Sequence, residues 1–319
     1  MPQAPTPIRA ARLHEHGKPL VIEAVELPEP GQDEVRVELE FAGVNPIDRY
    51  IAHGSVAADA PLPRTLGGEA AGSVDGRPVL VAGEALGTAR DGLWAGAAVV
   101  PSAAVVPLPD GVPTREAAAM GIAGLTAWKV VRELGRVTGE DRVVVLGASG
   151  GVGSVIVSLA RAAGATVWGQ TGSSEKAELI EQQGAERVVV GGADQLREAL
   201  SGFEPTVIFD PLGGEFVATA LESLAVRGRL VSFGTSAGAE VALNMQTLYR
   251  KMISVLGYGG MQIGRDERRQ GLQAALAAMA SGELQVRIDH VLALEQVNLA
   301  FERLARRQVQ GKLLLGLWS

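Results

Sequence analysis

The sequence predicts an α/β fold with two parts, a segment of short strands followed by a doubly wound parallel sheet. Three observations support this prediction. From about Ile8 to Leu108, short apolar runs are separated by Pro and Gly, which is typical of short strands between turns. From Arg142 to Gly234, continuous apolar strands alternate with helical segments, the pattern of a parallel sheet covered on both faces. The chain has 319 residues and is 47% hydrophobic, which is enough for two domains with cores of their own.

In the first part, Glu34–Val44 (EVRVELEFAGV) begins with polar and apolar residues in alternation and predicts a half-buried strand. Arg77–Ala82 and Ala97–Val100 predict further short strands. Arg115–Leu134 then has the composition of a helix, which we expect to be broken near Gly121 and Gly124.

The second part is predicted to alternate regularly between strands and helices. The expected strands are Arg142–Leu146, Thr166–Gln170, Arg187–Val190, Thr206–Asp210 and Arg229–Gly234, and the expected helices are Gly151–Ala163, Ser174–Gln183, Asp194–Leu200 and Glu215–Val226. The apolar run Ile253–Tyr258 (ISVLGY) fits either an edge strand that pairs with a second copy or an interior strand.

The last part has a mixed pattern. Helices are predicted at Arg265–Met279 and Leu294–Ala305, and strands at Val286–Val291 and Lys312–Leu317. By pattern alone, this tail either extends the parallel sheet or returns to the first part.

Composition excludes several classes of function. The net charge of -7 is opposite to the basic surface that nucleic-acid binding needs. The chain has no cysteine, so disulfides, thiolate metal sites and cysteine nucleophiles are impossible. No run has the length of a membrane span, and the beginning of the chain lacks the apolar stretch of a signal peptide. We therefore expect a cytoplasmic protein with no membrane or nucleic-acid partner.

The strongest local signal is the glycine-rich segment Ala148–Gly153 (ASGGVG), which follows a predicted strand and opens a predicted helix. Gly150 lets the backbone approach a pyrophosphate, and Gly153 lets the helix pack closely on the strand. The N–H groups of Gly151 and Val152 then point at the phosphates. The alternative is a glycine-rich turn needed only for packing. Because Ala148 replaces the first glycine of the usual pattern, the prediction of a dinucleotide site depends on this strand–turn–helix context.

The end of the next strand bears on which dinucleotide is bound. An NAD site usually has an acidic residue there, for the ribose 2′-hydroxyl. This chain has Gln170 instead, followed by Ser173 and Lys176, whose hydroxyl and ammonium suit a 2′-phosphate. The alternative is that Ser173 or Ser174 caps the next helix and Lys176 is a surface charge. The chemistry favours NADPH.

Several separate segments together resemble the medium-chain dehydrogenase/reductase superfamily, in its zinc-independent quinone oxidoreductase (zeta-crystallin-like) branch. The resemblance covers essentially the whole chain, and its order and spacing are specific. The segments that carry it are GVNPIDRY (Gly43–Tyr50), LGGEAAGSV (Leu66–Val74), VPLPDGVPTREAAAMGIAGLTAW (Val106–Trp128), the ASGGVG turn, FGTSAG (Phe233–Gly238) and GKLLL (Gly311–Leu315).

This resemblance implies a GroES-like, mostly-β catalytic domain made of residues 1–122 and 259–319. A Rossmann domain, residues 123–258, is inserted between the two parts. The tail is therefore expected to return to the first domain. The active site is expected in the cleft between the domains.

The resemblance also implies roles for individual residues. Asn45, Asp48 and Tyr50 match positions that line the nicotinamide and substrate pocket, and Asn45 and Tyr50 are the expected catalytic residues. The expected cofactor-binding residues are Asn45, Thr126, Gly150, Gly151, Val152, Ser173, Lys176, Phe233, Gly234 and Thr235. The chain departs from the family in a shortened loop between Val74 and Val99, and in Gly191, where some relatives have a tyrosine.

Zinc-containing members hold the metal through a cysteine and a histidine in these same segments. Here Asn45 has the cysteine position and Gly68 the histidine position, so we expect no metal site. Without a Lewis acid, hydride transfer is easiest to acceptors that are already electrophilic, such as quinones and α,β-unsaturated carbonyls. Asn45 and Tyr50 are expected to donate hydrogen bonds to the acceptor oxygen. A buried structural role for Tyr50 is the alternative.

Two other functions remain open at this point. One is an enoyl-thioester reductase, for which Arg49 and Arg64 are the candidate basic contacts. The other is a nucleotide-binding protein without significant turnover. Relatives often form homodimers through the edge of the Rossmann sheet, which we also expect here.

Overall fold

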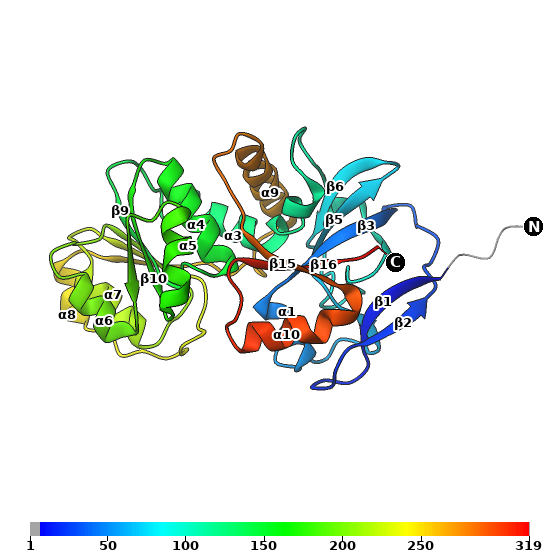
Figure 1. The fold of residues 1–319 in the computed structure, drawn as a ribbon, viewed down its shortest axis with the longest axis horizontal. Helices are drawn as coiled ribbons and strands as arrows, with labels where there is room; N and C mark the ends of the chain where they lie inside the picture. The colour runs from blue at the N-terminus through cyan, green and yellow to red at the C-terminus, as the bar shows by residue number, and fades with distance from the viewer. Residues whose placement is uncertain (1–6, 319) are drawn as a thin grey trace, which may run out of the picture. The chain divides into compact units, whose positions relative to one another are not determined.

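The computed structural model describes residues 7–318 and shows two compact units. Unit 1 comprises Met1–Leu125, Gly264–Ala280 and Ile288–Ser319, and unit 2 comprises Thr126–Ile263 and Ser281–Arg287. The α/β fold class predicted from the sequence is confirmed, with a mostly-β unit and a parallel-sheet unit (Figure 1).

Unit 1 is built on two sheets. The smaller sheet has the antiparallel order β2-β1-β4. The larger sheet has the order β15-β16-β3-β5-β6-β8, with β7 paired to β3. The strands are β1 (Ile8–Leu13), β2 (Val21–Val25), β3 (Glu34–Val44), β4 (Arg64–Thr65), β5 (Glu69–Val74), β6 (Arg77–Ala82), β7 (Ala97–Pro101), β8 (Val105–Pro107), β15 (Ile288–Ala293) and β16 (Lys312–Gly316).

The C-terminal tail returns to unit 1. Strand β16 pairs antiparallel with β3, with Leu313 opposite Val44 and Gly316 opposite Phe41, so red β16 lies beside blue β3 in Figure 1. Leu313, Leu314 and Leu315 are fully buried, so both faces of the sheet are covered at this interior strand. The ambiguity left by the sequence pattern is thus resolved in favour of a return. The helices of unit 1 include α1 (Pro46–Ala52), α2 (Thr114–Ala117), α9 (Arg265–Ala280) and α10 (Val297–Ala305).

The predicted break in the helix of Arg115–Leu134 is present, and it has an unusual form. Between α2 and α3 (Leu125–Trp128), the wide turn η2 (Met120–Gly124) is a π-helix, and a second one, η3 (Lys129–Leu134), follows. A Cβ on Gly121 would lie 2.7 Å from the Glu69 Cβ and 2.8 Å from the Ala82 Cβ. The glycine therefore lets η2 approach β5 and β6 closely. Wide turns of this kind are common at functional sites.

Unit 2 is a six-stranded, fully parallel sheet with the order β11-β10-β9-β12-β13-β14. Its strands are β9 (Arg142–Val145), β10 (Thr166–Thr171), β11 (Arg187–Val190), β12 (Val207–Asp210), β13 (Arg229–Ser232) and β14 (Ser254–Gly257). Its helices include α4 (Gly151–Ala162), α5 (Ala177–Gln182), α6 (Ala193–Ala199), α7 (Glu215–Ser223) and α8 (Met245–Arg250). Helices α4 and α5 cover one face of the sheet and α6 and α7 the other (Figure 1).

Two features of this order matter for the site. Successive strands run outward in opposite directions from the pair β9 and β12, which is the topological switch point where ligands bind in such sheets. Strand β14 lies at the end of the order, so the segment Ile253–Tyr258 is an edge and not an interior strand.

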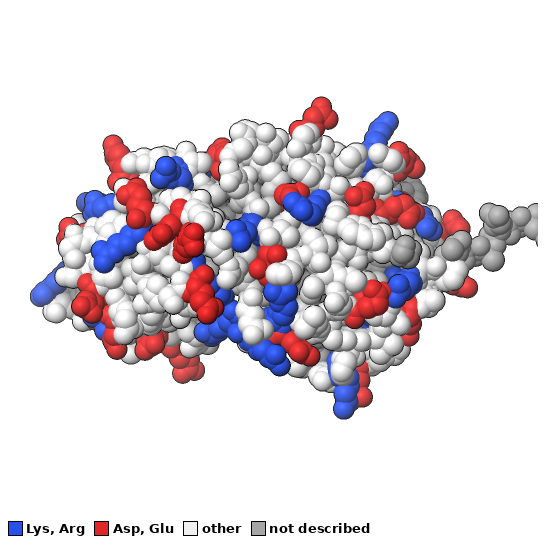
Figure 2. Space-filling view, in the orientation of Figure 1, with Lys and Arg blue, Asp and Glu red and all other residues white. Residues whose placement is uncertain are grey.

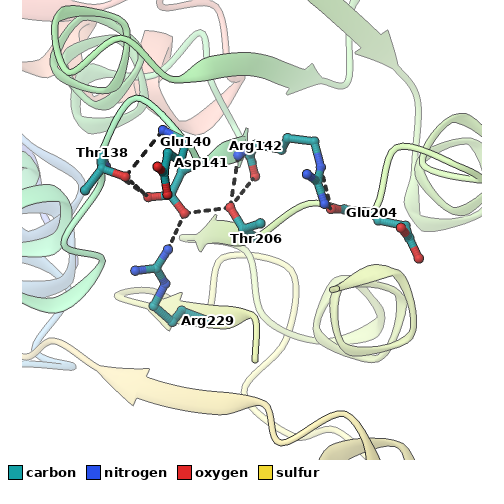
Figure 3. A network of polar contacts seen from close by, with 7 residues as sticks. All are labelled: Thr138, Glu140, Asp141, Arg142, Glu204, Thr206 and Arg229. Carbon is teal, nitrogen blue, oxygen red and sulfur yellow. Dashed lines mark hydrogen bonds and ion pairs between the residues drawn. The ribbon is translucent and has the colours of Figure 1, made fainter. Parts of the chain in front are cut away.

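The amino ends of β9, β12 and β13 are joined by a polar network (Figure 3). The Asp141 carboxylate accepts hydrogen bonds from the Thr138 N–H at 2.9 Å and the Thr206 hydroxyl at 2.7 Å, and it pairs with Arg229. The Arg142 side chain donates to the Glu204 carbonyl. Asp141 is buried, so these bonds offset the cost of removing its charge from water. The network therefore fixes the amino ends of these three strands. They lie at the edge of the sheet opposite to the carboxyl ends.

Figure 2 shows acidic and basic side chains interspersed over most of one face of the molecule, with uncharged surface between them. Among residues 7–318, no helix is long and apolar enough to cross a membrane.

Candidate cofactor and catalytic sites

In unit 2, the glycine-rich segment forms the turn between β9 and α4. Gly147 has a positive φ of 59°, and its carbonyl accepts a hydrogen bond from the Gly150 N–H at 3.0 Å, which closes the turn. A Cβ on Gly153 would lie 2.4 Å from the Gly147 oxygen, so only glycine allows α4 to start so close to the strand. The packing role expected for Gly153 is confirmed.

Gly150 plays a different part. A Cβ there would meet only the Gly147 oxygen, at 3.3 Å, so the space beside this residue is mostly open. Its lack of a side chain leaves the backbone accessible to a ligand. The first-turn N–H groups of α4, including those of Gly151 and Val152, have no intrahelical acceptors, and no side chain caps the helix at Gly150. This arrangement fits a phosphate group.

Gln170 connects this turn to the neighbouring strand end. Its Oε1 accepts a hydrogen bond from the Gly147 N–H at 3.1 Å, and its Nε2 donates to the Gly191 carbonyl at 2.6 Å. The Gln170 side chain is buried, and its oxygen and its nitrogen each make one of these two hydrogen bonds. Gln170 therefore fixes the geometry of the turn. Gly191 has a φ of 133°, which explains why glycine stands here in place of a larger residue.

Ser173 and Lys176 follow β10 in the short 3-10 helix η4 (Ser174–Lys176). Ser173 precedes η4 in an extended conformation, and its side chain makes no capping hydrogen bond. The alternative role of Ser173 as a helix cap is therefore wrong. Both Ser173 and Lys176 are half-buried. A Cβ on Gly172 would have no atom within 4 Å, so open space adjoins this segment.

Phe233, Gly234 and Thr235 leave the carboxyl end of β13, at the same edge of the sheet as the glycine-rich turn. The Phe233 N–H donates to the Asp210 carbonyl at 2.9 Å. A Cβ on Gly234 would lie 2.6 Å from the Pro211 oxygen, so this loop lies against the end of β12. Thr126 is half-buried on α3. The carboxyl edge of the sheet thus brings together the expected cofactor contacts from three strands.

In unit 1, the predicted residue Asn45 belongs to a buried polar cluster. Its Oδ1 accepts a hydrogen bond from the Lys312 Nζ at 2.5 Å, and its Nδ2 donates to the Glu69 Oε1 at 2.7 Å. Lys312 and Glu69 form an ion pair at 2.6 Å. Asn45, Lys312 and Glu69 retain 4%, 3% and 0% of their accessible surface, so the pair is strongly shielded from water.

Local structure explains how Glu69 is accommodated. It begins β5, and its Oε2 accepts a hydrogen bond from the Ile122 N–H of η2 at 2.7 Å. A Cβ on Gly43 would lie 2.1 Å from the Glu69 Oε1, so glycine is needed at that position of β3. The carboxylate therefore accepts hydrogen bonds from three groups, which compensates for its burial.

Asp48 lies beside this cluster on α1. Its Oδ2 accepts a hydrogen bond from the Asn45 N–H at 2.7 Å. Burial, reinforced by the nearby charge of Glu69, raises the pKa of Asp48 to about 7, although the hydrogen bond from Asn45 and the charge of Lys312 oppose the shift. The Asp48 carboxyl therefore titrates near neutral pH.

Tyr50 has a different environment from Asn45 and Asp48. It is 45% exposed, so the alternative of a buried structural tyrosine is wrong. Arg64 is 3% exposed, and burial lowers its pKa. It does not present an open basic contact.

A zinc ion does not fit the residues at positions 45 and 68. Both polar atoms of the Asn45 side chain are occupied by Lys312 and Glu69, the ammonium of Lys312 would repel a second cation, and Gly68 offers no side-chain ligand. In the part of the chain that the structure describes, no group of three or more His, Cys, Asp or Glu side chains is placed to hold a metal.

Sequence reasoning missed Glu69 and Lys312. A signal for them exists, since each is a single charged residue in an otherwise apolar strand segment, EAAG and KLLLG, and the two charges have opposite signs. Their pairing over 243 positions is a tertiary contact that no local pattern reveals.

Two family profiles match the chain. One is described as an alcohol dehydrogenase GroES-like domain and matches residues 31–110. The other is described as a zinc-binding dehydrogenase and matches residues 151–281.

Several relatives extend over nearly the whole chain. Quinone oxidoreductase 1 of Escherichia coli is 30% identical over 95% of this chain and 98% of its own length. Quinone oxidoreductase-like protein 2 of Bos taurus is 31% identical over 97% of this chain and 92% of its own length. A phenolphthiocerol/phthiocerol polyketide synthase of Mycobacterium tuberculosis is 29% identical over 93% of this chain, which corresponds to 14% of that protein.

Solved structures agree on the fold and differ in the cofactor. A mycobacterial protein complexed with NADPH has a TM-score of 0.84 at 25% identity and covers 97% of this chain and 99% of its own. The protein yhfP of Bacillus subtilis with NAD bound has a TM-score of 0.83 at 26% identity and covers 98% of this chain and 100% of its own. A nicotinamide dinucleotide is thus the cofactor that fits the turn at the end of β9.

Proposed function

The chain belongs to the medium-chain dehydrogenase/reductase superfamily, in its quinone oxidoreductase branch, and from this premise we propose that it is an NADPH-dependent reductase of quinones or α,β-unsaturated carbonyls that works without zinc. That it is an oxidoreductase with a nicotinamide cofactor follows from the family. The preference for NADPH, the acceptor class and the independence from zinc are the parts that we propose.

The observation that carries the proposal is the environment of Asn45. This amide has the position of a metal ligand in zinc-containing members, and it is bound to an ammonium and a carboxylate instead. A protein that lacks a Lewis acid must stabilise developing negative charge through hydrogen-bond donors. Quinones and enones delocalise this charge over their own conjugated systems, so they need the least stabilisation from the protein.

The side chains after β10 support the preference for NADPH. Gln170, at the position of the usual acidic residue, binds Gly147 through its oxygen and Gly191 through its nitrogen. The last residues of β10, Gln170 and Thr171, carry no carboxylate to bind a ribose 2′-hydroxyl, and the first one along the chain is Glu175 in η4. Ser173 has a side chain not used for capping, and Lys176 follows one helical turn later. A hydroxyl and an ammonium match the charge and donor needs of a phosphate.

In this proposal, the bound nicotinamide supplies the hydride. Gly151 and Val152 would hold the pyrophosphate through backbone N–H groups, and Gly150 would leave room for it. Thr126, Phe233, Gly234 and Thr235 would contact the nicotinamide half. The second Nδ2 hydrogen of Asn45 is the donor to the acceptor oxygen. Tyr50 offers a solvent-accessible phenol that donates a second hydrogen bond or the proton that completes the reduction.

The roles of Asn45 and Tyr50 are tested by substitution. Asn45→Ala removes one preorganised donor and should lower kcat/KM for a quinone by about 100-fold. Tyr50→Phe should lower it by about 10-fold, because an exposed phenol is partly replaced by water. Both variants should weaken NADPH binding much less than they lower kcat/KM, because the other expected cofactor contacts lie in unit 2. The catalytic roles would be wrong if both variants kept the original kcat/KM.

A second candidate is an enoyl-thioester reductase. The match to 14% of a polyketide synthase favours it, because polyketide synthesis proceeds on acyl thioesters. A phosphopantetheine would need a basic contact at the surface. Arg64 is buried and does not offer one, whereas half-buried Arg49 remains available. An assay with enoyl-CoA beside quinones separates the two acceptor classes.

We also propose that two copies associate through β14. Within the described part of the chain this edge strand has one free side, and apolar side chains on and near it are exposed: Tyr249 at 61%, Met252 at 50% and Val255 at 45%. Exposed apolar groups beside an unpaired strand edge favour pairing with another strand. Antiparallel pairing of two β14 strands about a two-fold axis would give one continuous sheet.

A further inference from the structure

The contacts of Asn45 determine which way its amide points. Lys312 is an ammonium that only donates hydrogen bonds, and Glu69 is a carboxylate that only accepts them. The atom 2.5 Å from the Lys312 Nζ must therefore be the amide oxygen, and the atom 2.7 Å from the Glu69 Oε1 must be the amide nitrogen. A flipped amide would place its N–H groups against the ammonium and its oxygen against the carboxylate.

This orientation limits what Asn45 can offer to a ligand. An amide has two N–H groups, of which one is bound to Glu69, and its oxygen accepts a hydrogen bond from the ammonium of Lys312. The second N–H is left as a donor for a ligand. Asn45 can thus donate to a ligand, and an oxygen atom is the matching partner.

We propose that Lys312 and Glu69 are positioning residues that fix Asn45 as a hydrogen-bond donor for the carbonyl oxygen of the acceptor. The inference rests on the proposed function and adds the reason for its specificity. A site with a fixed donor binds carbonyl and oxyanion groups and disfavours groups that can only donate, such as ammonium groups. Because the amide is already oriented, no free energy is spent on turning it during the reaction.

The ion pair suits this role better than a neutral pair. Two amides or hydroxyls could each donate or accept, and they would hold Asn45 in either orientation. Lys312 and Glu69 have no such freedom, and their opposite charges leave the cluster without an uncompensated charge. The Ile122 N–H of η2 in turn binds the Glu69 carboxylate, so this π-helical turn helps to fix the orientation of the Asn45 amide.

The test is the double substitution Lys312→Met/Glu69→Gln. It removes both charges together and so avoids leaving one buried ion unpaired. Met follows the shape of the lysine stem, and Gln keeps the volume of Glu69. In this variant Asn45 can adopt both orientations. We expect kcat for duroquinone to fall by about 10-fold, with the KM for NADPH unchanged.

A spectroscopic measurement separates positioning from a purely structural role. Duroquinone with isotopically labelled carbonyls, bound in the presence of NADP+, reports the hydrogen bond to its oxygen through its infrared carbonyl stretch. In the unsubstituted protein the stretch should lie below that of free quinone. In Lys312→Met/Glu69→Gln and in Asn45→Ala it should move back toward the free value.

The inference is overturned if the double variant folds with the original thermal midpoint and keeps both kcat and the carbonyl frequency, while Asn45→Ala changes them. If the double variant does not fold, Lys312→Gln/Glu69→Gln replaces it. This variant keeps polar contacts to Asn45 and still lets the amide adopt both orientations, and kcat and the carbonyl frequency are measured in the same way. If the unsubstituted protein reduces no quinone, the proposed function fails. The carbonyl frequency of the bound quinone then decides this inference alone, because it needs no turnover.

Discussion

Single residues explain how unit 1 accommodates one group of four buried polar side chains. Asn45, Asp48, Glu69 and Lys312 lie together, and each has a partner that the others or the backbone provide. Gly43 and Gly121 make room for them, because a Cβ on either would overlap Glu69. Buried polar groups with complete hydrogen bonding specify one arrangement, whereas incomplete networks are costly.

The proposed phosphate contact leads to a prediction at Lys176. Lys176→Ala should weaken NADPH binding by about 1–3 kcal/mol, because a charge-assisted hydrogen bond to the 2′-phosphate is lost. NADH binding should change little, since NADH lacks this phosphate. Dissociation constants from cofactor fluorescence measure both effects, and Lys18→Ala, on the surface of unit 1, is a matched control. Equal losses for NADPH and NADH would refute the assigned role.

Asp48 leads to a prediction about pH and stability. Its pKa is about 7 in the folded protein, raised mainly by burial from a value of 3.8. Between these two values the folded protein holds a proton that the unfolded chain has released. Stability therefore falls as the pH rises through this window, by as much as about 4 kcal/mol. Above about pH 7 the full cost of the buried charge is present.

Asp48→Asn should remove this dependence. Asn is uncharged at every pH, and its oxygen can still accept the hydrogen bond from the Asn45 N–H. Thermal midpoints of both proteins, measured from about pH 4 to about pH 8, should diverge in favour of the variant as the pH rises. Titrating groups away from this cluster are shared by the two proteins, so their contributions cancel in the difference. A difference that does not change with pH would show that Asp48 does not titrate in this range.

At the scale of elements, most of the strands could be predicted. The predicted ranges of β3, β6 and β11 agree with the structure, because alternating or continuous apolar runs are strong signals. The short helix α1 was not predicted, because its seven residues (PIDRYIA) have no clear apolar period, although a proline at its first position is a helix-start signal. Helix α8 was also missed. It has no buried residue, so no apolar face marks it, and it is capped by the Asn244 side chain.

The edge strand β14 gives a prediction about association. We expect Val255→Lys to convert a dimer into a monomer, because a charge on the pairing strand opposes burial at the interface. The molar mass from light scattering after size-exclusion chromatography measures this. Val21→Lys is the matched control, since Val21 is 47% exposed on β2 of unit 1. An unsubstituted protein with the mass of one chain at micromolar concentration would contradict the proposed interface.

For the molecule as a whole, the fold was more predictable than the site. Strand and helix periods indicated an α/β chain, and the resemblance resolved where the tail belongs. The glycine-rich turn could be recognised because its residues are contiguous. The Lys312–Glu69 pair could not, because its members are 243 positions apart and meet only when β16 inserts beside β3. Contacts of this kind depend on the complete tertiary structure.

The measurement that tests the central claim most directly is cofactor oxidation by the purified protein with a metal chelator present. NADPH and NADH are followed in parallel against a panel of quinones, alkenals and enoyl-CoAs. The account predicts turnover of quinones or alkenals that is faster with NADPH than with NADH and unaffected by the chelator. Loss of activity on chelation, or binding of NADPH without oxidation by any acceptor in the panel, would contradict it.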